Sequence, residues 1–257
     1  MQRFFITIEY DGTGLVGWQR QEEGQSVQQF LEEAAQQLTG QVTPIQGSGR
    51  TDAGVHATGQ VAHLDVPDKF DAKAVMLGIN AKLATNQVRI TKAIPVSDDA
   101  HARFSATSRS YLYKILNRKI APALHRDFIW HMPYPLDVNA MREGASYLIG
   151  KHDFTSFRAT ACQAKSPVRS IDKIVIDKDG DEIHIAVFAP SFLHHQIRNI
   201  TGTLAMVGRG KWQPEDVKSA LEAKDRRAGG ETAPAHGLYL TSINFDEALI
   251  ARRQVAQ

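Results

Sequence analysis

A hairpin signal in the second half of the sequence constrains the fold most. Two runs of alternating apolar and polar residues, 168–177 and 182–189, flank the pair Asp179 and Gly180. An Asp-Gly pair between alternating runs favours a tight turn with positive φ angles, and such a turn joins antiparallel strands. The sequence therefore predicts an antiparallel sheet in this half.

The other predicted elements follow the order β-α-β-β-α-β in each half of the chain. The helices are predicted from apolar residues at helical spacing and from capping residues, namely a capping box at Ser26 and Gln29 and an N-cap at Asp137. The first half has expected strands at 3–10, near Ile45, at 59–66 and at 87–94, with helices from Val27 to Gly40 and at 71–83. The second half adds to the hairpin strands at 108–116 and 237–245 and helices at 137–148, 193–207 and 214–223. Two copies of this order predict an α+β fold of two ferredoxin-like (βαββαβ) halves with mainly antiparallel sheets.

The two halves are expected to be residues 1–100 and 101–257, joined near 94–104. Lys and Arg number 8 against 12 Asp and Glu in the first half, and 22 against 16 in the second. A basic half fits a polyanion-binding face, so RNA or DNA is a plausible partner. Because the RNA-recognition fold and many unrelated proteins share this topology, the site must indicate the function.

Composition also bears on the compartment. No apolar run approaches the roughly 20 residues of a membrane span, and the first residues contain no apolar stretch of a signal peptide. The single cysteine, Cys162, excludes an internal disulfide and a multi-thiolate metal site. We therefore expect a cytoplasmic protein without a membrane partner.

The segment GSGRTDAG at residues 47–54 permits three interpretations. Its glycines could cradle a phosphate, but Asp52 stands where a dinucleotide fingerprint has its third glycine, and a strand follows instead of a helix. A structural Asx turn at Asp52 is the common alternative. In the third interpretation Asp52 is an ionised nucleophile or base. Arg50 would then oppose the rise in pKa that a covering substrate causes, or contact a substrate phosphate.

The stretch GRTDAGVHATGQV resembles the signature of the TruA family of tRNA pseudouridine synthases. Five further blocks resemble the family in the family's order and span nearly the whole chain: YDGTGLVGWQRQ, HARFSATSRSYLYKI, GKHDFTSFR, FLHHQIRNITG and GLYL.

The resemblance implies an isomerase that converts uridine to pseudouridine at positions 38, 39 and 40 in the anticodon stem-loop of tRNA. It also implies the pseudouridine synthase fold, whose two halves meet at a central cleft, and a homodimer that binds tRNA. Such an isomerisation is redox-neutral, so it requires no cofactor, nucleotide or metal.

Three residues match the family's catalytic positions. Asp52 matches the essential aspartate, and whether it attacks C1′, adds to C6 or removes a sugar proton stays open. Tyr111 matches a tyrosine that stacks on the flipped uracil and can assist proton transfer, although packing is the ordinary role of such an aromatic. Arg198 matches the basic residue that pairs with Asp52, although a surface arginine is the common alternative.

Further substrate contacts are expected from Arg50, Arg109, His194 and His195, beside Tyr111. Adjacent histidines on a helix lie about 100° apart and do not converge on one metal ion, so we expect RNA contact or packing and no metal. The family often has a second basic residue before the matched tyrosine, and here only Arg109 is present. The residues expected along the tRNA backbone are Arg103, Arg109, Lys114, Arg118, Arg158, Lys165 and Arg169.

Two other function classes compete with the isomerase. A non-catalytic RNA-binding protein or tRNA chaperone would need the basic residues but not Asp52. A hydrolase or nucleotide-binding enzyme built on the glycine loop would depend on ATP or a metal.

Overall fold

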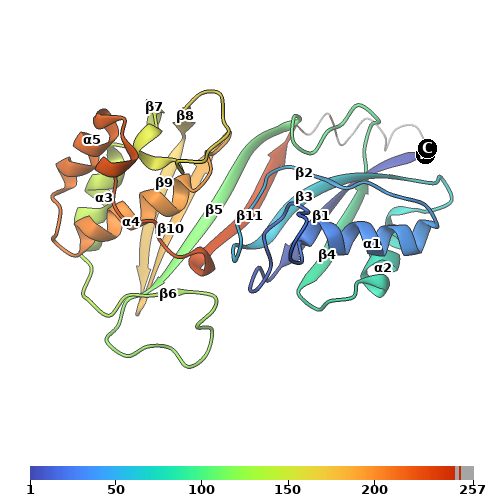
Figure 1. The fold of residues 1–257 in the computed structure, drawn as a ribbon, viewed down its shortest axis with the longest axis horizontal. Helices are drawn as coiled ribbons and strands as arrows, with labels where there is room; N and C mark the ends of the chain where they lie inside the picture. The colour runs from blue at the N-terminus through green and yellow to red at the C-terminus, as the bar shows by residue number, and fades with distance from the viewer. Residues whose placement is uncertain (247–248, 250–257) are drawn as a thin grey trace. The chain divides into compact units, whose positions relative to one another are not determined.

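The structure, a computed structural model, describes residues 1–246 and residue 249. It divides into two compact units, one formed by Met1–Arg109 with the chain from Leu240 onward, the other by Ser110–Tyr239. Each unit combines a sheet with helices (Figure 1), so the predicted α+β class is confirmed. None of the helices in the described residues is long and apolar enough to span a bilayer.

The first unit has the predicted β-α-β-β-α-β order. Its elements are β1 (Gln2–Tyr10), α1 (Val27–Thr39), β2 (Gln46–Gly47), β3 (His56–Val66), α2 (Ala72–Lys82) and β4 (Val88–Pro95), followed after a long interval by β11 (Leu238–Phe245). The sheet order is β4-β1-β3-β11, β1 is antiparallel to both neighbours, and β2 pairs with β3. Helices α1 and α2 cover one face of this sheet (Figure 1).

The start of α1 matches the predicted cap in part. Ser26 Oγ accepts a hydrogen bond from the Gln29 N–H at 3.2 Å, and Gly40 ends the helix with φ +77°. The predicted capping box is wrong, because the Gln29 side chain does not turn back to Ser26. Its Nε2 donates to Glu33 Oε1, one helical turn later, at 2.9 Å.

The second unit contains more helices and strands than the predicted βαββαβ repeat. Its elements are β5 (Ala106–Leu116), β6 (Trp130–His131), α3 (Val138–Ser146), β7 (Gly150–Asp153), β8 (Val168–Ile171), β9 (Lys173–Asp179), β10 (Glu182–Ala189), α4 (Gln196–Gly208) and α5 (Pro214–Ala223), with 3₁₀ turns η1 (Thr155–Phe157), η2 (Arg226–Ala228) and η3 (Ala235–Gly237). The sheet order is β5-β10-β9, with β6 parallel to β5, while β7 and β8 form a separate pair. Helix α3 packs against α4 and α5.

The predicted hairpin is confirmed as β9 and β10. Asp179 lies opposite Glu182, so the two turn residues are Gly180, with φ +56°, and Asp181, one position later than the Asp-Gly pair. The single strand predicted at 168–177 is wrong. The strand is interrupted at Asp172. The residues before this interruption form β8, which pairs with β7.

The compact units and the predicted halves divide the chain differently. The sequence predicts a boundary at residue 100, whereas the units divide at Arg109 and again at Leu240, inside β11. Alternation predicts that 237–245 is a strand, but it does not specify the partner strand. The functional roles of 1–100 and 101–257 stay predictions, and residues 247, 248 and 250–257 of the second half lie outside the described residues.

Candidate active site

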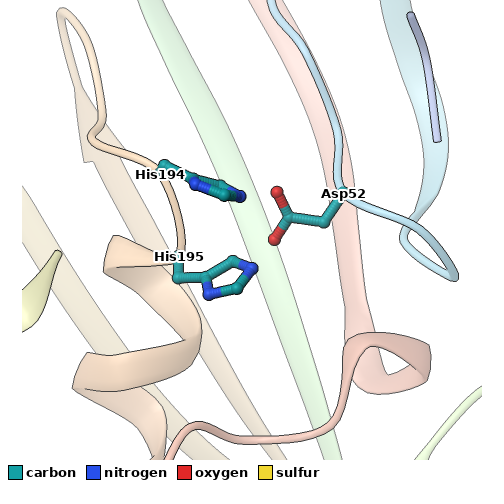
Figure 2. A group of neighbouring side chains, drawn as sticks. All are labelled: Asp52, His194 and His195. Atoms are coloured by element: carbon teal, nitrogen blue, oxygen red, sulfur yellow. The ribbon is translucent and has the colours of Figure 1, made fainter. Parts of the chain in front are cut away.

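Asp52 lies in the loop of residues 48–55, which joins β2 to β3 in the first unit (Figure 2). Its carbonyl accepts a hydrogen bond from the Val55 N–H at 3.1 Å, and Gly54 completes the turn with φ +76°. Thr51 is buried, and its Oγ1 lies 2.8 Å from the Tyr10 hydroxyl oxygen, within hydrogen-bond distance. The half-buried Asp52 side chain therefore projects from a main chain that is fixed on both sides.

Two glycines allow the segment after β1 to approach this loop. A Cβ at Gly17 would lie 2.4 Å from the Thr51 carbonyl oxygen, and Gly17 has φ +104°. A Cβ at Gly12 would lie 2.2 Å from the Val55 carbonyl oxygen. These positions admit only glycine without displacing the loop. The sequence interpretation missed this role, although the glycines of DGTGLVG were the available signal.

Arg109 and Gln60 fix the start of the loop. Arg109 Nη2 donates to the Ser48 carbonyl oxygen and Oγ, both at 3.3 Å, and to the Arg103 carbonyl oxygen at 2.9 Å. Gln60 is fully buried, and its Nε2 donates to the Gly49 carbonyl oxygen at 2.9 Å. Arg109 therefore has protein acceptors within the loop, and its contact with substrate stays a prediction.

Arg50 is exposed at the edge of the loop. Its Nε donates to Gln19 Oε1 at 3.0 Å, and Gln19 Nε2 in turn donates to Gln28 Oε1 at 2.7 Å. This chain of contacts ties Arg50 to the first turn of α1. Support of Asp52 or contact with phosphate by Arg50 stays a prediction.

Two buried histidines on β3 accept hydrogen bonds from main-chain groups. His56 Nδ1 accepts from the Gly12 N–H at 3.1 Å, so Nδ1 carries no proton in that arrangement. His63 Nδ1 accepts from the Ala102 N–H at 3.2 Å. Burial, together with the neighbouring charges of His101 and Arg3, lowers the pKa of His63 to about 4. His63 is therefore neutral near pH 7.

Tyr111 lies on β5 in the second unit and is half-buried. Its ring meets Phe192 edge to face, with centroids 5.2 Å apart and planes at 84°. Tyr113, two residues later, is fully buried and donates from its hydroxyl to the Pro234 carbonyl oxygen at 2.7 Å, and burial raises its pKa. Tyr113 is thus a core residue, whereas stacking of Tyr111 on uracil stays a prediction.

His194 and His195 precede α4 instead of lying on it. The helix begins at Gln196, and its N-cap residue His195 has φ +61°, which breaks the helical path. The two rings lie close together (Figure 2), with centroids 4.1 Å apart and planes at 48°. The expected 100° separation on a helix is therefore wrong, and it gives no argument against a metal. RNA contact by this pair stays a prediction.

Arg198 lies in the first turn of α4 and is half-buried. Its Nε donates to the Ala233 carbonyl oxygen at 2.8 Å, and its own carbonyl oxygen accepts from the Ala233 N–H at 3.0 Å. A guanidinium that is hydrogen-bonded at Nε has a fixed plane, which sets the directions of its Nη groups. Sequence reasoning missed Ala233 because its main chain makes the contact, so its residue type gives no signal.

The other basic residues expected along the tRNA backbone are all at least partly exposed. The Arg103 guanidinium lies over the Phe104 ring at 5.6 Å, and Lys114 Nζ lies over the Tyr239 ring at 4.7 Å. Their contact with RNA stays a prediction for the whole set: Arg103, Lys114, Arg118, Arg158, Lys165 and Arg169.

Comparison with known proteins identifies the family. The family model for tRNA pseudouridine synthase matches residues 6–105 and 145–246. The tRNA pseudouridine synthase A of Rhodospirillum rubrum is 51% identical over 245 residues, which cover 95% of this chain and 88% of that protein. The proteins of the same name from Paramagnetospirillum magneticum and Caulobacter sp. are each 50% identical, covering 95% and 96% of this chain and 96% and 99% of their own lengths. The protein described here therefore belongs to the tRNA pseudouridine synthase family.

Proposed function

We propose that this protein isomerises uridine to pseudouridine in tRNA, at positions 38, 39 and 40 of the anticodon stem-loop. The observation that carries the proposal is the family match at about half identity over nearly the whole chain. The described geometry adds support, because the half-buried Asp52 carboxylate projects from a loop that is held in place by the close approach of Gly12 and Gly17 and by main-chain hydrogen bonds.

The proposed reaction breaks the N1–C1′ glycosidic bond, turns the uracil and forms a C5–C1′ bond. The proton on C5 is released to solvent, N1 takes up a proton in its place, and the oxidation state of the nucleoside does not change. The reaction therefore needs no redox cofactor, and no step of the proposal uses a nucleotide or a metal. Asp52 supplies the anion, as a nucleophile at C1′ or C6 or as a base toward the sugar.

Tyr111 and Arg198 are the other catalytic residues of the proposal. Tyr111 offers an aromatic face to a uridine that is taken out of its stack, and it has already one edge-to-face neighbour in Phe192. Arg198 supplies a fixed cation for the Asp52 carboxylate. The positively charged second half and the exposed basic residues would contact the tRNA backbone.

Assembly and compartment belong to the same proposal. We expect a homodimer that binds tRNA, as the family resemblance implies, and a cytoplasmic location, as the composition suggests. Size-exclusion chromatography with light scattering, with and without tRNA, measures the assembly directly.

The test is release of tritium from tRNA transcripts that carry ³H at uridine C5, in EDTA and without nucleotide. Asp52→Asn removes the anion with little change in shape. Asp71→Asn is the matched control, because Asp71 caps α2 in the same unit and asparagine caps a helix equally well. We expect release by the wild type and by Asp71→Asn, and none above background by Asp52→Asn.

The other outcomes are equally informative. Equal release by the wild type and Asp52→Asn would remove Asp52 from catalysis. Binding of tRNA without release by any of the three proteins would favour an RNA-binding protein or chaperone. Loss of wild-type activity in EDTA would contradict the metal-free mechanism. Mapping of pseudouridine in the product then tests positions 38, 39 and 40.

A further inference from the structure

The segment after η2, residues 229–237, lies against α4, and we refer to it as the strap. The Gly230 N–H donates to Thr203 Oγ1 at 3.0 Å, in the buried part of the unit. At Gly202 a Cβ would lie 1.8 Å from the Glu231 carbonyl oxygen, so only glycine permits this approach. The strap is therefore in direct contact with the helix that carries Arg198.

A side-chain network holds the middle of the strap to Asn199. Thr232 Oγ1 donates to Asn199 Oδ1 at 2.6 Å, and Asn199 Nδ2 donates to the Phe157 carbonyl oxygen at 2.9 Å. Arg226 Nη2 lies within hydrogen-bond distance of Asn199 Oδ1, the Gly230 carbonyl oxygen and Thr232 Oγ1, at 3.1, 2.9 and 3.0 Å. The partly buried Arg226 guanidinium thus joins the helix to the strap at three oxygens.

The next strap residues reach Arg198 and β5. Ala233 both accepts from Arg198 Nε and donates to the Arg198 carbonyl oxygen. The Pro234 carbonyl oxygen then accepts from Tyr113, and a Cβ at Gly237 would lie 2.7 Å from the Tyr113 ring. The strap therefore connects the helix of Arg198 with the strand of Tyr111.

We propose that the strap sets the position of the Arg198 guanidinium for catalysis, and that Thr203, Asn199 and Arg226 are positioning residues that act through it. The inference rests on the proposed function. An arginine side chain has several rotatable bonds, and the hydrogen bond from Nε to the Ala233 carbonyl oxygen fixes its plane. A displacement of about 1 Å at a reacting group can lower a rate about 10²-fold, so the residues that hold Ala233 control the rate.

Two threonines of α4 provide a matched comparison. Thr201 and Thr203 are both fully buried and lie two residues apart. Thr201 Oγ1 has no hydrogen-bond partner among the residues that the structure describes, whereas Thr203 Oγ1 donates to the Asn199 carbonyl oxygen at 2.7 Å and accepts from Gly230. Substitution by valine keeps the shape of both side chains, and only at Thr203 does it remove a contact with the strap.

The experiment measures single-turnover tritium release and tRNA affinity for Thr203→Val, Thr201→Val and Thr203→Ser. We expect Thr203→Val to lower the rate constant about tenfold or more and to change the tRNA Kd less than about twofold. Thr201→Val should stay within about twofold of the wild type in both quantities. Thr203→Ser restores the hydroxyl and should recover most of the rate.

A double-mutant cycle with Arg198→Lys tests whether Thr203 acts through Arg198. Lysine keeps a charge but has no Nε–H in the same place, so Thr203→Val should have little further effect in that background. Multiplicative effects of the two substitutions would overturn the inference, as would equal rates for Thr201→Val and Thr203→Val. If Thr203→Val does not fold, Arg226→Lys takes its place in the cycle, with the same expected loss of rate at unchanged tRNA affinity. A wild type without release would instead contradict the proposed function.

Discussion

The Asp52 loop and the strap hold a charged candidate residue by different means. In the first unit, the main chain around Asp52 is fixed by close approach of Gly12 and Gly17 and by main-chain hydrogen bonds. In the second unit, Arg198 is held through the strap by a network of side chains that includes Asn199 and Arg226. The first arrangement leaves no room for a Cβ at Gly12 or Gly17, whereas the second depends on hydroxyl, amide and guanidinium groups.

The difference follows from the length of the two side chains. Asp52 has a short side chain, so once its main chain is fixed only the two side-chain torsions χ1 and χ2 decide where the carboxylate lies. Arg198 has a long side chain, and its helix alone leaves the guanidinium mobile, so a second segment must bind it near its end. A short anion therefore needs a rigid loop, and a long cation needs a separate contact.

The largest effect is expected where the charge itself is removed. Asp52→Asn keeps the size and shape of the side chain, and the main-chain and Thr51 hydrogen bonds described for the loop do not require the charge of the carboxylate. We expect the rate of pseudouridine formation to fall about 10³-fold or more, which corresponds to about 4 kcal/mol in the barrier. Thermal unfolding should be nearly unchanged. Substantial remaining activity would mean that the loop is rigid for a reason other than catalysis.

The next effect tests the rigidity of the same loop. Gly17→Ala would place a Cβ 2.4 Å from the Thr51 carbonyl oxygen at a φ of +104°. We expect a loss of about 2–3 kcal/mol in the free energy of unfolding, measured in urea, and a lower rate of tritium release. Gly49→Ala is the matched control, because a Cβ there meets no atom within 4 Å. Equal stability of the two variants would show that the loop adapts.

Acid should weaken the first unit without any substitution. Because the pKa of His63 lies at about 4, below its ordinary 6.5, the unfolded chain binds a proton more readily between these values. Stability therefore falls as the pH drops from about 6.5 toward 4, by about 1.5 kcal/mol between pH 6.5 and 5. In His63→Asn, whose Oδ1 can accept from the Ala102 N–H in place of Nδ1, this decline in urea stability should be smaller. An identical decline in both proteins would assign it to other groups.

Sequence patterns predicted the local features well. Helix N-caps at Ser26 and Asp137 accept the expected N–H groups, and the hairpin predicted around Asp179 and Gly180 forms as β9 and β10. The Asp52 loop could also be recognised from the sequence, because its glycines and charged residues are contiguous. These features depend on neighbours in the chain, which a periodic pattern can represent.

The parts that were missed depend on distant residues or on the main chain. Thr203 and Gly230 lie 27 positions apart, and Arg198 meets Ala233 35 positions later, so no period or motif links them. The left-handed conformation of His195 is unusual for a non-glycine residue, and the helical pattern gave no sign of it. Such contacts follow from tertiary packing, and the sequence alone does not specify them.

The smallest effect is expected at Arg50, which sharpens the contrast with Arg198. Arg50 is exposed, and its Nε donates to a glutamine side chain, so the described contact fixes it only at the edge of the loop. Arg50→Gln should change the single-turnover rate less than about threefold while raising the tRNA Kd modestly, with a weaker dependence of affinity on salt. Arg198→Lys should do the reverse, lowering the rate more than the affinity. A rate loss in Arg50→Gln as large as that in Arg198→Lys would mean that Arg50 supports Asp52 directly, and both cations would then belong to the catalytic machinery.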